Sequence, residues 1–551
     1  MTYQNLYNQW LQNSLYNEEL QGIHNDEHEI EERFYQQVQF GTGGMRGKLG
    51  AGTNRINTHT IRLVAEGLAR QIEAQGELAK MRGVVIAYDT RHFSQEFAYE
   101  TAGVLAAHGI QSYVFKDSRP TPELSFAVRY LAAYAGVVIT ASHNPKQYNG
   151  FKVYGEDGAQ LTPQLADEIV AHMNAVDSIF EIPNLSRSQL QTSGLCVEIL
   201  EKLDEAYLQA LTRLKLQDDM NQSLSIVYTP LHGSGLEPVK RGLQSYGFSN
   251  VHIVHEQETP DGEFPTVTYP NPEEADAFRL AMELGEKVGA QLLLATDPDA
   301  DRLGVAVLDN GAYKLLTGNQ LGALLLHYIL SSKQVPSNAA LIKTIVTSEF
   351  GAAVANEFGV TTVNTLTGFK YIAEKIAEWE QTKEHTFMFG YEESYGYLAA
   401  DFVRDKDAVQ IALLTAEMAA YYDLRGQTLS DVLNELYEGL GYYNEALISL
   451  TFDGSEGQKK IASIMKRFRE QPLAQVAGEA VVKAEDYLKE SIDGLPQADV
   501  VKFMLADDSW ICVRPSGTEP KCKIYIGVKK ESAAQSGQAI EQLKAAVMQL
   551  I

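Results

Sequence analysis

The sequence predicts an α/β protein of four domains, in which three similar domains with mixed sheets precede a C-terminal α+β domain. The chain of 551 residues is too long to fold around one hydrophobic core, because single cores stop growing at about 250–300 residues. A strand–helix–strand pattern occurs three times along the chain, and the C-terminal part follows a different pattern.

Each of the three repeated units has an apolar β-branched run, a loop, a helical stretch, a glycine and a second apolar run. The units begin at GVVIAYDTR, LSIVYTPLHGSG and ALIKTIVTSEF. Gly109, Gly247 and Gly359 stand where a helix needs a left-handed residue before a new strand. Units of this kind predict parallel or mixed sheets covered by helices.

The rest of the chain suggests the domain limits. Near the C-terminus, SWICVRPSGTEPKCKIYIGVKK is typical of a strand–turn–strand and is followed by a polar helix. The N-terminal segment is expected to form polar helices on the outside of the first domain. We therefore predict domains at residues 1–205, 206–325, 326–440 and 441–551.

Composition excludes several classes of protein. Hydrophobic residues make up 45% and charged residues 21% of the chain, as in ordinary globular proteins. The net charge of −26 disfavours binding to nucleic acid or to an anionic membrane surface. No apolar run approaches a membrane span, the N-terminus is unlike a signal peptide, and three cysteines fit neither a disulfide framework nor a zinc pattern. A reducing, cytoplasmic location is the simplest expectation.

The segment DPDADR (297–302) is the sharpest local signal. It lies between two apolar strand-like runs, and its carboxylates at every second position would point the same way in an extended segment. An EF-hand loop is excluded, because the sixth position is Arg302 and the twelfth is Leu308. A solvated acidic turn is the ordinary alternative. The functional interpretation is a Mg²⁺ site beside which Arg302 holds an anion.

A second signal is TASHNP (140–145), which follows the strand-like run AGVVIT. Ser142 at a strand end is a candidate nucleophile, although it lacks the flanking glycines of the hydrolase elbow. A polar turn closed by Asn-Pro is the alternative. Lys152 follows shortly afterwards and could move a proton on a sugar hydroxyl, whereas a surface lysine is its commoner role.

Three further loops are suited to anions or sugars. FGTGGMRG (40–47) offers flexible backbone N–H groups and an arginine, as a phosphate cradle does. RPSGTEP (514–520) combines a guanidinium, two hydroxyls and a turn glycine. EES (392–394), between aromatic residues, can hydrogen-bond sugar hydroxyls. A glycine-rich turn, a hairpin turn and an exposed acidic turn are the respective alternatives.

Together, FGTGGMRG, TASHNP, DPDADR, YEESYG and RPSGTEP occur in the order that resembles the α-D-phosphohexomutase superfamily. The resemblance extends from about residue 35 to about residue 525 and is strongest to the longer branch of phosphoglucomutases and phosphopentomutases. It implies four domains around a central cleft and an isomerase that acts as an intramolecular phosphotransferase. The implied reaction interconverts glucose 1-phosphate and glucose 6-phosphate through a phosphoserine and a bound glucose 1,6-bisphosphate.

The resemblance also implies roles for residues. Ser142 would be the phosphoserine, and Mg²⁺ would bind a phosphoserine oxygen with Asp297, Asp299 and Asp301. Arg46, His143 and Lys152 match positions that surround the phosphoserine and assist proton transfer.

Substrate recognition is implied for a second group: Glu392 and Ser394 in the sugar-binding loop, Lys370 near a substrate phosphate, and Arg514, Ser516, Gly517 and Thr518 in the distal phosphate loop. Tyr391 stands where the family often has glycine, so substrate choice is left open.

Several alternatives remain open at this point. A phosphomannomutase or a phosphopentomutase would use the same motifs, and a metal-dependent sugar phosphatase would also need Ser142 and the three aspartates. A non-catalytic sugar-phosphate sensor and a sugar-bisphosphate synthase are the other candidates. The expected partner is a small sugar phosphate, and the chain could be a monomer or a homodimer.

Overall fold

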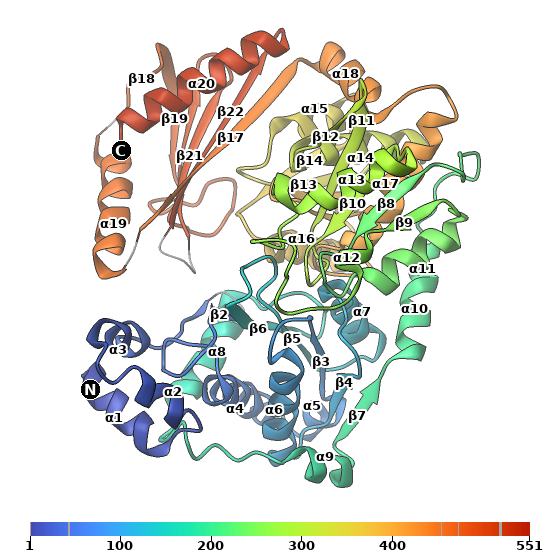
Figure 1. Cartoon of the computed structure of the whole chain (residues 1–551). Coiled ribbons are helices and arrows are strands. Elements are labelled where there is room, and N and C mark those ends of the chain that lie inside the picture. Colours follow the sequence, from blue (N-terminus) through green and yellow to red (C-terminus); the bar gives the residue numbers. More distant parts are fainter. Residues whose placement is uncertain (1, 42–43, 453, 472, 517–520) are drawn as a thin grey trace. The chain divides into compact units, whose positions relative to one another are not determined.

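The computed structural model describes residues 2–41, 44–452, 454–471, 473–516 and 521–551, without the side chains of residues 454–456 (Figure 1). Its contacts divide the chain into two compact units. The first unit comprises Met1–Leu316, Ala373–Thr382 and Ser394–Gly426. The second unit comprises Thr317–Ile372, Lys383–Glu393 and Gln427–Ile551.

The first unit begins with three helices and a seven-stranded mixed sheet of order β1-β2-β6-β5-β3-β4-β7. Strands β3 and β5 are parallel and buried throughout, as their continuous apolar runs require. The strands are β1 (Phe40–Gly41), β2 (Gly44–Lys48), β3 (Val84–Tyr88), β4 (Ser112–Phe115), β5 (Ala135–Ile139), β6 (Tyr148–Tyr154) and β7 (Cys196–Ile199). The helices are α1 (Tyr3–Asn13), α2 (Asn17–Gly22), α3 (Glu27–Phe34), α4 (Thr58–Ala74), α5 (Glu77–Arg82), α6 (Ser94–Ala107), α7 (Thr121–Tyr130), α8 (Pro163–Asn174) and α9 (Arg187–Ser193).

A second sheet of the first unit has the order β12-β11-β10-β8-β9. Strands β8, β9 and β10 are parallel, whereas β11 and β12 return antiparallel. The strands are β8 (Ile226–Thr229), β9 (Val251–Ile253), β10 (Leu292–Thr296), β11 (Leu303–Asp309) and β12 (Ala312–Leu315), and β16 (Gly396–Leu398) also belongs to this unit. The helices are α10 (Glu201–Thr212), α11 (Leu236–Tyr246), α12 (His255–Glu258), the 3₁₀ helix η1 (Ala275–Phe278), α13 (Arg279–Val288) and α17 (Ala408–Asp423).

The second unit contains a parallel arrangement of β14, β13 and β15 and a six-stranded antiparallel sheet. The parallel strands are β13 (Ala339–Thr344), β14 (Thr361–Thr365) and β15 (Thr386–Glu392), and their helices are α14 (Gly318–Ser332), α15 (Glu349–Glu357) and α18 (Leu429–Leu440). Helix α16 (Phe369–Thr382) begins in this unit and ends in the first.

The six-stranded sheet forms the C-terminal α+β domain and has the order β17-β22-β21-β20-β19-β18. Alternation along β21 sends Ile511 and Val513 into a core with helices α19 and α20, and Trp510 and Cys512 into a second cluster. The elements are β17 (Tyr442–Thr451), α19 (Gly454–Glu470), β18 (Gln475–Val476), β19 (Glu479–Asp486), β20 (Val501–Leu505), β21 (Trp510–Pro515), β22 (Lys521–Lys530) and α20 (Ala533–Gln549).

The three predicted strand–helix–strand units are confirmed. Each forms a parallel strand pair around one helix: β3-α6-β4, β8-α11-β9 and β13-α15-β14. Gly109, Gly247 and Gly359 have φ angles of +71°, +95° and +66°, the left-handed conformation predicted for the helix ends. The domain limits at residues 205, 325 and 440 stay predictions.

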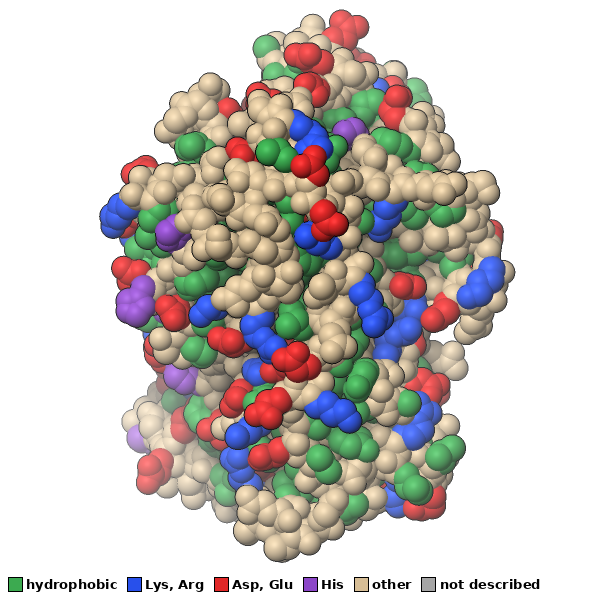
Figure 2. Space-filling model, turned by 90° about the vertical axis from the view of Figure 1, so that its right-hand side faces the viewer, with side chains coloured by type: hydrophobic (Ala, Val, Ile, Leu, Met, Phe, Trp, Pro, Cys, Tyr) green, Lys and Arg blue, Asp and Glu red, His purple; other side chains and the backbone are tan. Residues whose placement is uncertain are grey.

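The described surface carries both charges. Lys and Arg side chains are interspersed with Asp and Glu over the face drawn in Figure 2. In the part of the chain that the structure describes, no helix combines the length and the apolar composition of a membrane span.

Glu445 on β17 gives a testable pH dependence of stability. It accepts hydrogen bonds from Ser348 and Asn319, yet burial raises its pKa from 4.5 to about 7. The folded protein therefore binds this proton more tightly than the unfolded chain, so stability falls as the pH rises from 4.5 to about 7. Such a shift is equivalent to about 3 kcal/mol, which the partial exposure of the side chain reduces.

We expect Glu445→Gln, which resembles the protonated acid, to melt at a higher temperature than the native protein at about pH 8 and to lose this advantage near pH 4. Thermal melts across this range check the expectation. Glu438→Gln on the exposed face of α18 is the control. Equal shifts for both variants would contradict the assignment to Glu445.

Candidate active site

Ser142 lies just after β5, in the turn that leads to β6. Its φ of +52° is left-handed, a conformation that costs a non-glycine residue about 1 kcal/mol. The backbone N–H of Ser142 donates to Thr140 Oγ1 at 2.8 Å, and its hydroxyl donates to Asp297 Oδ2 at 2.8 Å. His143 Nδ1 is 3.1 Å from the same hydroxyl. The turn thus fixes a buried serine hydroxyl against a carboxylate.

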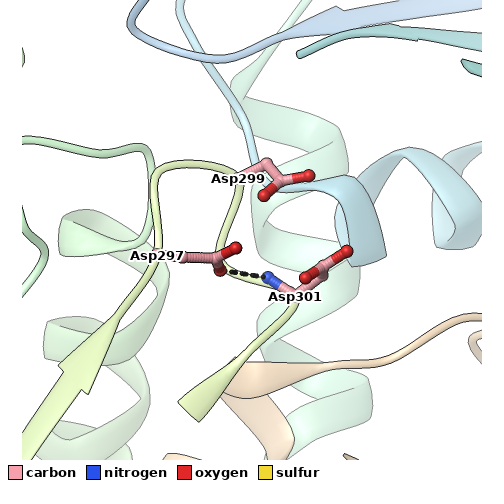
Figure 3. Close-up of side chains that lie close together, drawn as sticks. All are labelled: Asp297, Asp299 and Asp301. Carbon is pink, nitrogen blue, oxygen red and sulfur yellow. Dashed lines mark hydrogen bonds between the residues drawn. The ribbon is translucent and has the colours of Figure 1, made fainter. Parts of the chain in front are cut away.

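The three aspartates of the loop between β10 and β11 converge, as Figure 3 shows. Their carboxylate oxygens lie within 4.8 Å of one another, and all three residues are buried. The expectation of an extended segment is wrong: Ala300 has a φ of +46°, and its N–H donates to the carbonyl of Asp297, so the loop is a tight turn. The turn, rather than strand alternation, brings the carboxylates together.

This aspartate cluster fits a metal ion. Asp299 Oδ1 and Asp301 Oδ1 are buried without a hydrogen-bond partner among the described residues. Burial and the two neighbouring carboxylates raise the pKa of Asp297 well above its usual range. Several close carboxylates stay ionised only beside positive charge, and oxygen donors of this kind suit a hard cation.

Two of the predicted basic residues belong to this site. Lys152 on β6 places its ammonium 3.0 Å from Asp299 Oδ2 and 3.5 Å from Asp301 Oδ2. Burial alone would raise the pKa of Asp299, but the charge of Lys152 holds it well below its usual range. Arg46 on β2 donates to Asn144 Oδ1 at 2.8 Å, so its guanidinium is attached to the serine turn.

Arg302 follows the aspartates directly, and its guanidinium donates to Glu273 Oε1 at 2.6 Å. The guanidinium is also 3.9 Å from Asp301 Oδ1. Arg302 is therefore oriented by a carboxylate from the segment before η1, at the edge of the aspartate cluster.

Two residues of this site were not predicted from the sequence. Lys406 places its ammonium 3.1 Å from Asp301 Oδ2. Thr121, the first residue of α7, binds Asp299 twice: its hydroxyl donates to Oδ2 and its N–H to the carbonyl, both at 2.9 Å. The alternating charges of RDKD (404–407) within an apolar stretch were the only local signal for Lys406, and RPTPE (119–123) gave none.

In the second unit, the structure brings two of the predicted recognition segments together. Glu392 is only 6% exposed, so the alternative of an exposed acidic turn is wrong. Its Oε1 accepts a hydrogen bond of 2.8 Å from the N–H of Gly368, in the loop that leads to Lys370. Tyr391 is fully buried, and its ring fills the space beside Gly322 and Gly351. The departure from glycine at this position is therefore accommodated in the core.

The other predicted recognition residues are described in part. Arg514 lies on β21 opposite Lys523 of β22, and the N–H of Ser516 donates to the carbonyl of Lys521. Gly517 and Thr518 lie outside the described residues. Ser394 belongs to the first unit, so the structure does not join it with Glu392 in one unit.

Repeated α/β domains with a serine turn against a three-aspartate loop define the class of four-domain phosphohexomutases. Models of the phosphoglucomutase/phosphomannomutase family match the chain in four segments: alpha/beta/alpha domain I at residues 37–179, domain II at 205–311, domain III at 317–440, and the C-terminal domain at 460–546. The chain belongs to the phosphoglucomutase/phosphomannomutase family.

Two curated relatives are similar over almost their whole length. The phosphoglucomutase of Staphylococcus haemolyticus is 39% identical over 521 residues, which cover 93% of this chain and 94% of the relative. The phosphoglucomutase of Staphylococcus aureus strain MSSA476 is 40% identical over 528 residues, 94% of both chains. The prediction of a phosphohexomutase, an intramolecular phosphotransferase of the phosphoglucomutase type, is confirmed.

Solved structures agree on the fold. A putative phosphomannomutase from Thermus thermophilus has a TM-score of 0.69 at 24% identity, and the match covers 94% of this chain and 99% of the other. An Aspergillus fumigatus N-acetylphosphoglucosamine mutase, solved with GlcNAc-6P and magnesium, has a TM-score of 0.50 at 14% identity, over 94% and 96% of the two chains.

The contact between Thr121 and Asp299 predicts an effect on metal affinity. We expect Thr121→Val, which loses the hydroxyl that orients the carboxylate, to bind Mn²⁺ or Mg²⁺ about tenfold more weakly. Thr121→Ser keeps the hydroxyl and should bind as the native protein does. Calorimetric titration of the metal-stripped protein measures both. Equal affinities for the valine variant and the native protein would refute this role.

Proposed function

We propose that the chain interconverts glucose 1-phosphate and glucose 6-phosphate, with the transferred phosphoryl group carried on Ser142. The observation that supports this most directly is the 2.8 Å hydrogen bond from Ser142 Oγ to Asp297 Oδ2. It joins a candidate nucleophile to a cluster suited to a cation, which is what phosphoryl transfer requires. The two staphylococcal relatives named phosphoglucomutases support the choice of glucose.

We propose Mg²⁺ as the cation, held by Asp297, Asp299, Asp301 and an oxygen of the phosphorylated Ser142. The buried carboxylate oxygens without partners support this, as does the magnesium present in the Aspergillus relative. When bound, Mg²⁺ would neutralise the charge that develops on the phosphoryl oxygens.

The protein groups around Ser142 would position the phosphoryl group and move one proton. In the forward half-reaction the serine O–P bond breaks, a new bond forms to the sugar oxygen, and the hydroxyl proton leaves the sugar. His143 Nδ1, at 3.1 Å from Ser142 Oγ, is within reach to return a proton to the serine oxygen. Lys152, in its neutral form, is our candidate for accepting the proton that leaves the sugar hydroxyl. Arg46 and Arg302 are candidates for holding the phosphoryl oxygens.

Recognition of the sugar and of the non-reacting phosphate is assigned to a second group of residues. We propose Glu392 and Ser394 for the sugar hydroxyls, Lys370 for a phosphate, and the loop of Arg514, Ser516, Gly517 and Thr518 for the distal phosphate. The distal loop distinguishes a mutase from a phosphatase, because only the mutase must hold one phosphate while the other reacts. Glucose 1,6-bisphosphate would be the intermediate that turns end for end between the two half-reactions, and added bisphosphate would activate the enzyme.

Phosphorus NMR of glucose 1-phosphate tests the proposal, in the presence of Mg²⁺ and a trace of glucose 1,6-bisphosphate. We expect a glucose 6-phosphate resonance to grow with the native protein and with the exposed-site control Ser188→Ala. Ser142→Ala should lose at least about 1000-fold in rate, because the covalent route is gone. Removing Mg²⁺ with EDTA should abolish the reaction, and added Mg²⁺ should restore it.

Other outcomes would change the assignment. Free phosphate without glucose 6-phosphate would indicate a sugar phosphatase. Turnover of mannose 1-phosphate or ribose 1-phosphate in preference to glucose 1-phosphate would indicate a phosphomannomutase or a phosphopentomutase. Full activity of Ser142→Ala would refute the phosphoserine.

A further inference from the structure

A buried ion pair, Asp89 with Arg91, lies beneath the serine turn. Its residues end the segment GVVIAYDTR, to which the sequence analysis gave only a structural role. Asp89 and Arg91 follow β3, the strand that lies beside β5 in the seven-stranded sheet. Both side chains are 0% exposed. Arg91 Nε is 3.2 Å from Asp89 Oδ2. A fully buried ion pair is costly unless its remaining hydrogen-bonding groups are satisfied, so their partners indicate what the pair does.

The guanidinium of Arg91 binds the backbone of the serine turn. Nη2 donates to the carbonyls of Ser142, at 2.5 Å, and of Asn144. Nη1 donates to the carbonyls of Pro145 and Tyr148, at 2.8 and 3.1 Å. One planar group thus holds four carbonyls from the nucleophile to the first residue of β6. A lysine ammonium does not have this geometry.

The carboxylate of Asp89 holds the other side of the same turn. Its Oδ2 accepts a hydrogen bond of 2.6 Å from Thr140 Oγ1, and that hydroxyl oxygen accepts the N–H of Ser142 at 2.8 Å. Ser94 Oγ donates to Oδ1 at 2.8 Å and fixes the carboxylate. The N–H of Ser142 is therefore connected to Asp89, and its carbonyl to Arg91.

These contacts act on a residue in an unfavourable conformation. Ser142 has a φ of +52°, which a non-glycine residue keeps only when its surroundings enforce it. Arg91 also holds the carbonyl of Asn144, whose side chain receives the guanidinium of Arg46. Displacement of the turn would move both the serine hydroxyl and Arg46.

We infer that Asp89 and Arg91 are positioning residues that keep the Ser142 hydroxyl directed at Asp297, and that the rate of phosphoryl transfer depends on them although neither touches the hydroxyl. The expected effect of these residues on the reaction rate rests on the proposed function. Their expected effect on the geometry of the serine turn does not.

Arg91→Lys tests the inference, because it keeps a positive charge but cannot span four carbonyls. We expect kcat to fall about 100-fold, as for a misplacement of about 1 Å, while KM changes less than about threefold, since the substrate-recognition groups are unaffected. Arg82→Lys is the matched control: Arg82 binds the carbonyls of Ala132 and Ala133 in the same domain, at 2.9 and 3.1 Å, away from the serine turn. Its kcat should be that of the native protein.

Thr140 provides a second pair of variants in case Arg91→Lys does not fold. Thr140→Val removes the hydroxyl between Asp89 and Ser142 and should lower kcat, whereas Thr140→Ser should restore it. Hydrogen exchange in residues 140–148 reports on the turn without any substrate and should accelerate in Arg91→Lys but not in Arg82→Lys.

The outcomes separate the inference from the proposed function. An inactive native protein whose turn exchanges faster in Arg91→Lys would refute the glucose reaction and keep the positioning role. A native-like kcat and native-like exchange in a folded Arg91→Lys would overturn the inference. If Arg91→Lys lowered the melting temperature but left kcat unchanged, Arg91 would only stabilise the fold, and the inference would also be overturned.

Discussion

The site depends on one constraint: two left-handed residues, Ser142 and Ala300, turn the chain sharply at the carboxyl ends of two buried strands. The φ angles of +52° and +46° are those that side chains adopt only at a cost. Strands β5 and β10 are buried along their whole length, so polar groups are tolerated only where these strands end. Each turn directs its side chains toward the other turn, and the hydrogen bond from Ser142 to Asp297 joins the two turns.

Such turns keep their shape because their backbone groups are bound from outside. Ser234 donates twice to the carbonyl of Pro298, Thr121 donates to that of Asp299, and the N–H of Ala408 donates to that of Ala300. Arg91 does the same for the serine turn through four carbonyls. Buried polar groups that are fully paired rigidify a structure, whereas partly paired ones are costly. In the aspartate loop, as far as the structure describes the chain, Asp299 Oδ1 and Asp301 Oδ1 are buried without a hydrogen-bond partner, and a cation would contact them there.

The sequence was informative where the relevant pattern is local. The three strand–helix–strand units, with Gly109, Gly247 and Gly359, follow from hydrophobic period and helix-end chemistry, both of which act over a few residues. Ser142 and the aspartates were found because their motifs are contiguous. Thr121 lies 178 residues from Asp299 and Arg91 lies 51 from Ser142, so no local pattern connects them. The convergence of the aspartates was predicted, but it was attributed to an extended segment rather than to a tight turn. The turn depends on the left-handed conformation of Ala300, for which an alanine gives no sequence signal.

The proposed reaction has two half-reactions, and they place different demands on the residues proposed for the chemistry and on those proposed for sugar recognition. The serine, the aspartates and their lysines belong to the first unit, as does Ser394. Lys370, Glu392 and Arg514 belong to the second unit. In the proposed reaction the phosphoryl group reacts at one fixed centre both times, so that centre benefits from the dense hydrogen bonding seen around Ser142. The sugar, by contrast, must be held in two opposite orientations. The side chains that bind the sugar therefore meet different hydroxyls in each orientation and cannot match only one of them. This requirement favours long side chains with several hydrogen-bonding atoms, such as arginine, lysine and glutamate.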